Sequence, residues 1–110
     1  MEGVVIDSVN GGAGNAIVLD SYDGFRIKDT TIKNANFAIH SDLAVPPGAQ
    51  DDLSFENVTV DNVNVVYQHD NFIARDTSGA ITATNVATAN CVNNGTINGS
   101  TLTINGVACP

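Results

Sequence analysis

Apolar and polar residues alternate along residues 25–42, and residues 53–70 repeat the same alternation at a spacing of 28 positions. Phe25 aligns with Leu53 in this comparison, and Phe37 aligns with Val65. Alternation with a period of two indicates β-strands, and the abundance of Val, Ile and Thr favours strand over helix. We therefore expect three short strands in each unit, at residues 25–28, 30–33 and 37–40 and again at residues 53–56, 58–61 and 65–68.

Weaker copies of this unit start near residues 4, 81 and 102, so the repeat extends over nearly the whole chain of 110 residues. A repeat of this size is typical of a solenoid, in which each unit buries its apolar face by stacking on its neighbours. We expect one all-β domain over residues 1–110, a parallel β-helix of four to five coils that start near residues 4, 25, 53, 81 and 102. Residues 43–52, which contain Pro-Pro-Gly, are predicted to form a surface loop inserted between two coils.

Asn and Asp residues fall at the expected bends. Asp29 and Asn57 occupy the first bend of the two central units, and Asn34 and Asn62 occupy the second. Asn tolerates left-handed backbone angles, and its amide can hydrogen-bond to its own chain. Identical bends stacked coil on coil also allow the amides to pair, so we expect an Asn ladder along the solenoid. Glycosylation acceptor triplets begin at Asn57, Asn94 and Asn98, and their use depends on a eukaryotic, secreted source.

Composition and charge narrow the range of partners. Lys and Arg total 4 against 12 Asp and Glu, giving a formal net charge of −8, so the basic face that nucleic-acid binding requires is missing. The same charge repels polyuronates unless calcium bridges carboxylate to carboxylate. No apolar run reaches the ~20 residues of a membrane span, so we expect no membrane partner. The sequence begins without a signal peptide, and the first coil is expected to present an open strand edge, as in a piece of a longer protein or in chains that associate end to end.

Three segments carry a resemblance to a known group: IKDTTIKNANFAI (residues 27–39), SFENVTVDNVNVVYQ (residues 54–68) and ITATNVATAN (residues 81–90). They resemble the coils of the right-handed parallel β-helix proteins of the pectin-lyase-like superfamily. That superfamily includes polysaccharide lyases, galacturonan hydrolases and non-catalytic surface proteins, and the fold alone does not choose among them. The resemblance implies a secreted, polysaccharide-active protein that is part of a lyase or glycoside hydrolase acting on a uronate-type polymer.

Two other functions stay open at this point. One is a non-catalytic structural or carbohydrate-binding module that stacks end to end. The other is ice binding, which requires regular rows of Thr side chains on a flat face. Thr31 is expected to stack on Thr59, but the row is expected to end at Ala87.

Three carboxylates provide a candidate metal site. Residues 16–20 are expected to pair with residues 37–42, which places Asp20, Asp42 and Asp70 at the ends of three stacked strands. Stacked strands lie ~4.8 Å apart, so these carboxylates are close enough to share a Ca²⁺ ion. The alternative is that each Asp caps its own turn.

The candidate catalytic residues are His40, Arg75, Asp51 and Asp52. His40 is expected to face outward beside Leu19 and to act as an acid or base near neutral pH, whereas His69 is expected to lie in the core.

Arg75 resembles the Arg base of calcium-dependent pectate lyases in residue type and rough position, and the alternative is a surface ion pair with Asp70 or Asp76. Asp51 and Asp52 are candidates for a carboxylate acid–base pair, with a solvated turn as the alternative. Gln68, Tyr22, Arg26 and Lys28 are the candidate substrate-binding residues. Arg26 and Lys28 belong to an Arg-Ile-Lys triplet that looks like one in galacturonan hydrolases, although its order relative to Asp51 is reversed.

Cys91 and Cys109 are the two cysteines of the chain. An even pair in an acidic, Asn- and Thr-rich chain indicates an oxidising, extracellular compartment and a disulfide that ties the last strand to the previous coil. Such a bond stabilises a domain by roughly 3 kcal/mol. Zinc is not expected, because a pair of cysteines without a neighbouring His supplies too few ligands.

Overall fold

The computed structural model is an all-β parallel solenoid of about three turns, which confirms the predicted fold class. It describes residues 1–20, 22–42, 50–70 and 73–109. The elements are β1 (Val5–Asp7), the short 3₁₀ helix η1 (Val9–Gly12), β2 (Ile17–Leu19), β3 (Tyr22–Asp23), β4 (Arg26–Asp42), β5 (Gln50–Asp51), β6 (Ser54–Asp70), β7 (Ile73–Arg75), β8 (Ser78–Asn93), β9 (Thr96–Asn98), β10 (Thr103–Ile104) and β11 (Val107–Ala108).

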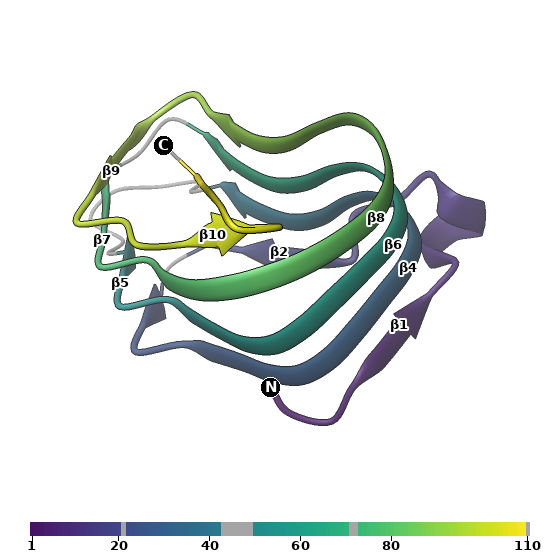
Figure 1. Cartoon of the computed structure of the whole chain (residues 1–110), viewed down its shortest axis with the longest axis horizontal. Helices are drawn as coiled ribbons and strands as arrows, with labels where there is room; N and C mark the ends of the chain where they lie inside the picture. The colour runs from purple at the N-terminus through teal and green to yellow at the C-terminus, as the bar shows by residue number, and fades with distance from the viewer. Residues whose placement is uncertain (21, 43–49, 71–72, 110) are drawn as a thin grey trace.

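Two sheets run along the described part of the solenoid. The larger has seven strands in the order β1-β4-β6-β8-β10-β11, with β2 also paired to β4, and the smaller has four strands in the order β3-β5-β7-β9. Figure 1 shows the long strands β4, β6 and β8 as three curved bands lying side by side. The structure has fewer turns than the predicted four to five coils. At one end, β1 and β2 cover only parts of β4, and at the other end β10 turns back to pair antiparallel with β11.

The central repeat has the predicted register. Arg26 pairs with Ser54 at one end of β4 and Asp42 pairs with Asp70 at the other, so the spacing of 28 holds along both strands. The three predicted short strands of each unit are segments of one long strand that bends twice. The small second sheet was not predicted, because its strands are only two or three residues long.

The outer registers differ from the predicted ones. Ile81 pairs with Val58 and not with Leu53. The spacing is already 24 where Ser54 pairs with Ser78, and it falls to 23 at Val58 because two residues of β6 between Phe55 and Val58 face only one residue of β8. Thr31 pairs with Val5 in the first coil, where Phe25 was expected to align with Val4. At the other end Ile104, and not Leu102, aligns with Ile81. Bends and loops of unequal length shift the outer coils, while the two central strands have equal lengths.

The bends carry the predicted left-handed residues. Asp29 and Asn57 have φ angles of 50° and 51° at the first bend, and Asn34 and Asn62 have φ angles of 56° and 58° at the second. Several of these side chains bond between coils: the Asn57 amide donates to Asp29 at 2.7 Å and the Asn62 amide donates to Asn34 at 2.8 Å. The preference of Asn and Asp for left-handed angles therefore sets where each long strand turns.

The apolar positions of β4 and β6 fill the interior, where Ile27, Ile32, Ile39 and Tyr67 are almost fully buried. Alternation along residues 37–40 predicts that Phe37 and Ile39 point inward and that Ala38 points outward, and this prediction is wrong for Phe37 and Ala38. Ala38 is fully buried in the core cluster, while Phe37 is only half-buried. The alternation shifts by one residue here because the chain rounds the second bend just before this point.

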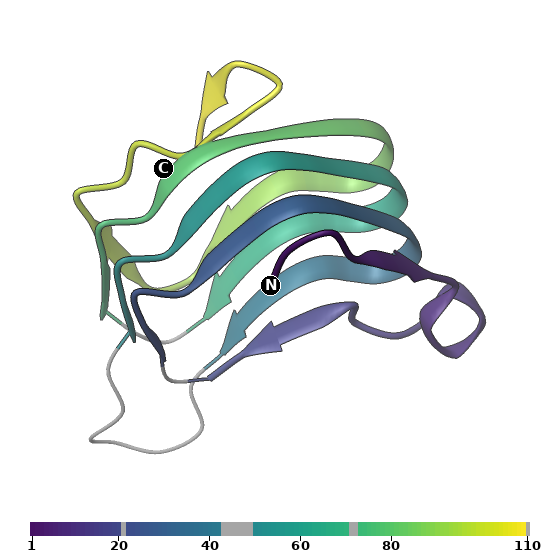
Figure 2. The same cartoon turned by 90° about the horizontal axis from the view of Figure 1, so that it is seen from below.

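The C-terminal end is closed by a hairpin. Strands β10 and β11 pair antiparallel, and the predicted disulfide joins Cys109, after β11, to Cys91 on β8. Figure 2 shows this hairpin at the opposite end of the stack from β1. No helix in the described ranges is long and apolar enough to span a membrane. Of the predicted loop at residues 43–52, residues 43–49 lie outside the described part of the chain, and residues 50–51 form β5.

Candidate functional site

The outer surface at the ends of β4 and β6 carries a cluster of hydrogen-bonded polar side chains. The imidazole Nε2 of His40 lies 2.7 Å from the Oδ2 atom of Asp70, and the two side chains are 14% and 18% exposed. The amide nitrogen of Asn15 lies 3.5 Å from the other imidazole nitrogen, Nδ1. Because an amide nitrogen can only donate, this arrangement assigns the proton to Nε2, which donates to Asp70. His40 therefore faces outward, as predicted, and is held between two coils.

Asp70 is the centre of the cluster. The amide nitrogen of Gln68 lies 3.1 and 2.9 Å from its two carboxylate oxygens, and the amide of Asn94 donates to Oδ1 at 2.7 Å. Burial raises the pKa of Asp70, but the hydrogen bonds from Gln68, Asn94 and His40 outweigh burial and hold the pKa below its ordinary value of 3.8. The carboxylate is therefore charged at neutral pH and solvated by fixed N–H donors.

Apolar groups border the same cluster. The ring of Phe37 packs edge-on against the imidazole of His40, with ring centroids 5.2 Å apart. Val18 on β2 pairs with His40 and is 59% exposed, while Leu19, which was expected beside His40, is buried opposite Ser41. Polar side chains that donate and accept hydrogen bonds thus lie beside exposed apolar surface, which is the combination that binds a sugar ring through its hydroxyls and its C–H face.

The predicted calcium site is only partly visible. Asp42 pairs with Asp70 in the backbone register, but the side chain of Asp42 lies outside the described set. Asp20 follows β2 and is exposed. Among the described residues no group of three His, Cys, Asp or Glu side chains is arranged to hold a metal ion. A cation at Asp70 would also have to displace the N–H donors that already occupy its oxygens, so the calcium site stays a prediction.

The other catalytic candidates lie on the second sheet. Arg75 on β7 pairs with Asp51 on β5, with Nη2 3.4 Å from the carboxylate. The partner expected from the sequence for a surface ion pair was Asp70 or Asp76. Its side chain is 62% exposed, so this is a surface ion pair of small energetic weight. Asp52 is a bend residue with a φ angle of 56°, and its backbone N–H donates to the carbonyl of Arg75. The turn interpretation of Asp52 therefore accounts for its geometry.

The interior between the two sheets contains a second polar group of residues. Tyr22 is only 7% exposed, with its hydroxyl 3.4 Å from the Ser41 hydroxyl, so it lies in the core and not at a surface site for substrate. His69 is fully buried, as predicted, and its Nδ1 atom lies 3.4 Å from the same Ser41 hydroxyl. These residues fill the solenoid where its wall turns from the large sheet to the small one.

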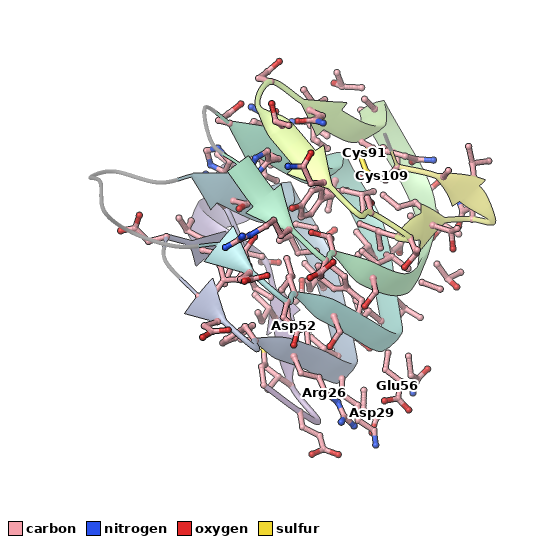
Figure 3. All side chains as sticks on the ribbon, turned by 90° about the vertical axis from the view of Figure 1, so that its left-hand side faces the viewer. Arg26, Asp29, Asp52, Glu56, Cys91 and Cys109 are labelled. Atoms are coloured by element: carbon pink, nitrogen blue, oxygen red, sulfur yellow. A yellow bond between two sulfur atoms is a disulfide. The ribbon has the colours of Figure 1, made fainter. Side chains whose placement is uncertain are left out.

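Arg26 and Lys28 project from the first segment of β4. Arg26 forms an ion pair with Glu56 at 3.1 Å, and Lys28 lies 3.9 Å from Glu56 and from Glu2 on the two adjacent coils. Figure 3 shows Arg26 and Glu56 together at the far end of the molecule from the disulfide. These charges neutralise one another between coils, and the structure does not bring them to the polar side chains around His40 and Asp70.

The row of Thr side chains is longer than expected. Thr31 pairs with Thr59, and Thr59 pairs with Thr82, because the register of β8 places Thr82 where Ala87 was expected. The parallel row contains Lys33, Asp61 and Thr84. The face is therefore mixed and charged, and only β8 presents two Thr side chains in this segment.

Sequence reasoning missed three side chains that contact His40 or Asp70: Asn15, Phe37 and Asn94. Asn94 contacts Asp70 across 24 residues, which differs from the central spacing of 28. A search for Asn at shorter spacings, as one expects when a bend or loop loses residues, would have found it. Asn15 belongs to the Gly-rich residues 9–15, whose composition by itself predicts only a turn.

Comparisons of the chain with protein-family models, with curated proteins and with solved structures found no match.

Proposed function

We propose that this chain is a secreted, non-catalytic β-solenoid that binds a neutral polysaccharide through the His40 cluster, defined as Phe37, His40, Gln68, Asp70 and Asn94. The observation that carries the proposal is the half-buried ring of Phe37 beside a network of oriented amide, imidazole and carboxylate groups on the outer surface. Sugar hydroxyls both donate and accept hydrogen bonds, so a fixed network of this kind fits them. The disulfide supports secretion, because such bonds persist in oxidising compartments.

Charge favours a neutral polymer over a uronate. The chain has a net charge of −8, and three of its four Lys and Arg side chains form ion pairs with Asp or Glu. A polyuronate approaching Asp70 would meet a carboxylate that is ionised at neutral pH and would need a bridging cation.

The residues proposed for lyase or hydrolase chemistry do not converge, which supports a binding role. His40 and Asp70 belong to the large sheet, whereas Arg75 and Asp51 form an ion pair on the small one. A hydrolase needs an acid and a base on opposite sides of one bond, and a lyase needs a base beside a neutralised carboxylate. A right-handed member of the pectin-lyase-like superfamily is compatible with the proposal, since that superfamily includes non-catalytic proteins.

End-to-end association of copies stays a prediction. The first coil leaves β1 and β2 as the outermost strands, with Val5 68% exposed. Strand edges of this kind can add another strand, but two copies of a strongly acidic chain repel each other.

The test is sedimentation of the protein with insoluble cellulose, xylan and chitin, and gel retardation by soluble polygalacturonate with and without calcium. We expect retention by a neutral polymer, a roughly fivefold or larger weakening by Gln68→Ala, and no change for the control Glu56→Ala on the same strand. Urea unfolding of both variants checks that they fold.

Three outcomes overturn parts of the proposal. Absence of binding to every polymer removes the binding role. Selective binding of polygalacturonate in calcium removes the preference for a neutral chain. Release of reducing or unsaturated sugars from any polymer shows an enzyme.

A further inference from the structure

A polar groove lies beside η1, where that short helix stands against the second bend of the solenoid. Figure 1 shows η1 projecting next to the turns of β4 and β6. The groove has a volume of about 400 Å³, within the roughly 300–1,000 Å³ of small-molecule sites. Its lining consists of Ser8, Gly11, Gly12, Asn34, Ala35, Asn62, Val63 and Asn64.

The amides along this groove are held in place by hydrogen bonds between coils. Asn34 donates to Asp7 at 2.7 Å, Asn62 donates to Asn34 at 2.8 Å, and Asn64 donates to Asn36 at 2.8 Å. Each amide is therefore fixed before any ligand arrives, which lowers the entropy cost of binding. Stacked strands repeat at ~4.8 Å, so the groove presents amide groups at regular intervals.

On the η1 side the groove is lined by Ser8 and by two glycines, Gly11 and Gly12. Gly11 and Gly12 have φ angles of 64° and 91°, in the left-handed region that glycine adopts freely. A Cβ atom on Gly12 would lie 3.6 Å from the carbonyl oxygen of Asn34, which shows how closely this segment approaches the bend. Two successive residues without side chains keep the rim of the groove open.

The segment that forms this wall continues directly to the His40 cluster. The carbonyl of Gly14 accepts a hydrogen bond from the backbone of Asn36 at 2.8 Å, and the amide of Asn15 reaches His40. Asn64 and Gln68 are four residues apart on β6, a separation of about 13 Å at most for an extended strand. One extended chain of a few sugar rings can therefore contact both places.

We infer that the groove is a second saccharide subsite, and that an extended neutral glycan occupies the groove and the His40 cluster together. This inference rests on the proposed function. With two subsites, the affinity of the protein for the glycan rises with the length of the glycan until both subsites are filled, because the second contact becomes intramolecular. The His40 cluster alone does not produce this rise.

The test is calorimetric titration of the full chain with cellobiose to cellohexaose and with xylobiose to xylohexaose. The variants are Asn62→Gly, the matched control Asn57→Gly, and Asn64→Ala. Asn62 and Asn57 are both exposed, both have left-handed φ angles and both donate one amide hydrogen bond to the neighbouring coil, but only Asn62 lines the groove. Glycine keeps the left-handed backbone at both positions, so the pair separates loss of a ligand contact from loss of stability.

We expect the wild type to bind the longest oligosaccharide of one series at least tenfold more tightly than the disaccharide. Asn62→Gly and Asn64→Ala remove most of this gain and leave disaccharide binding unchanged, while Asn57→Gly behaves as the wild type. Wild-type binding without a length dependence overturns the second subsite and keeps the first. A length dependence that survives in both groove variants also overturns it. No binding of any oligosaccharide to the wild type is the distinct result that removes the proposed function itself.

Discussion

Gly79→Ala is expected to destabilise the fold strongly, because Gly79 is where β8 turns with one residue fewer than β6. Its φ angle is 107°, and a Cβ atom there would overlap the carbonyl oxygen of Phe55 and lie 2.8 Å from the Phe55 carbonyl carbon and nitrogen. Phe55 cannot move away easily, because its side chain is 3% exposed and its ring packs against Tyr67 at 6.1 Å. The clash is therefore between two backbones held by the core.

The magnitude follows from two contributions. Placing Ala in the left-handed region costs about 1–2 kcal/mol, and overpacking against a rigid neighbour costs a further ~1–3 kcal/mol. Gly24→Ala is the matched control, because Gly24 has a φ angle of 73° but no atom within 4 Å of its would-be Cβ. The control carries only the first contribution, so the free energies of unfolding of the two variants should differ by about 2 kcal/mol.

Urea unfolding followed by far-UV circular dichroism measures this difference. With an m value of about 2 kcal/mol/M for a small domain, the midpoint of Gly79→Ala should lie about 1 M below that of Gly24→Ala. Two variants with unfolding free energies within about 0.5 kcal/mol of each other would refute the close approach of β8 to Phe55 and the register on which it depends.

Two further predictions concern the disulfide and pH. Replacement of Cys91 and Cys109 by Ala should lower the unfolding free energy by about 3 kcal/mol, since the disulfide closes a loop with a sequence separation of 18. Urea unfolding measures this loss, and an unchanged midpoint would contradict the prediction. The lowered pKa of Asp70 adds stability above the unfolded-state pKa, taken as the ordinary value of 3.8, and this stability is lost as the pH falls through the lower folded-state pKa. Wild type should therefore lose its advantage over Asp70→Asn on acidification from pH ~6 to pH ~2, and a pH-independent difference in unfolding free energy contradicts the hydrogen-bonded carboxylate.

Local patterns in the sequence were sufficient to predict the repeating unit. The alternation of apolar residues predicted strands, and the spacing of 28 predicted the pairing of β4 with β6 along their whole length. Asp29 and Asn34 predicted the bends, because the tolerance of left-handed angles is a property of the residue itself. The burial of His69 and the single possible disulfide followed from the same local reasoning.

The tertiary structure decided which coils meet in which register, and with it the members of the candidate site. Strand β8 starts with a spacing of 24 from β6 at Ser54 and Ser78, and one residue fewer at its first bend shifts Ile81 to Val58. A second irregularity between Val63 and Val65 restores the spacing of 24, which places Asn94 beside Asp70. The segment after η1 brings Asn15 to His40. The pairing of β7 with β5 on the small sheet brings Arg75 to Asp51 and not to Asp70. A solenoid stacks each coil on the one before it, so an insertion or deletion in a bend or loop changes the contacts that follow it until a compensating change restores the register, as happens between Val63 and Val65. The sequence thus determined the shape of one coil, whereas the register of the stacked coils determined which side chains meet at the candidate binding surface.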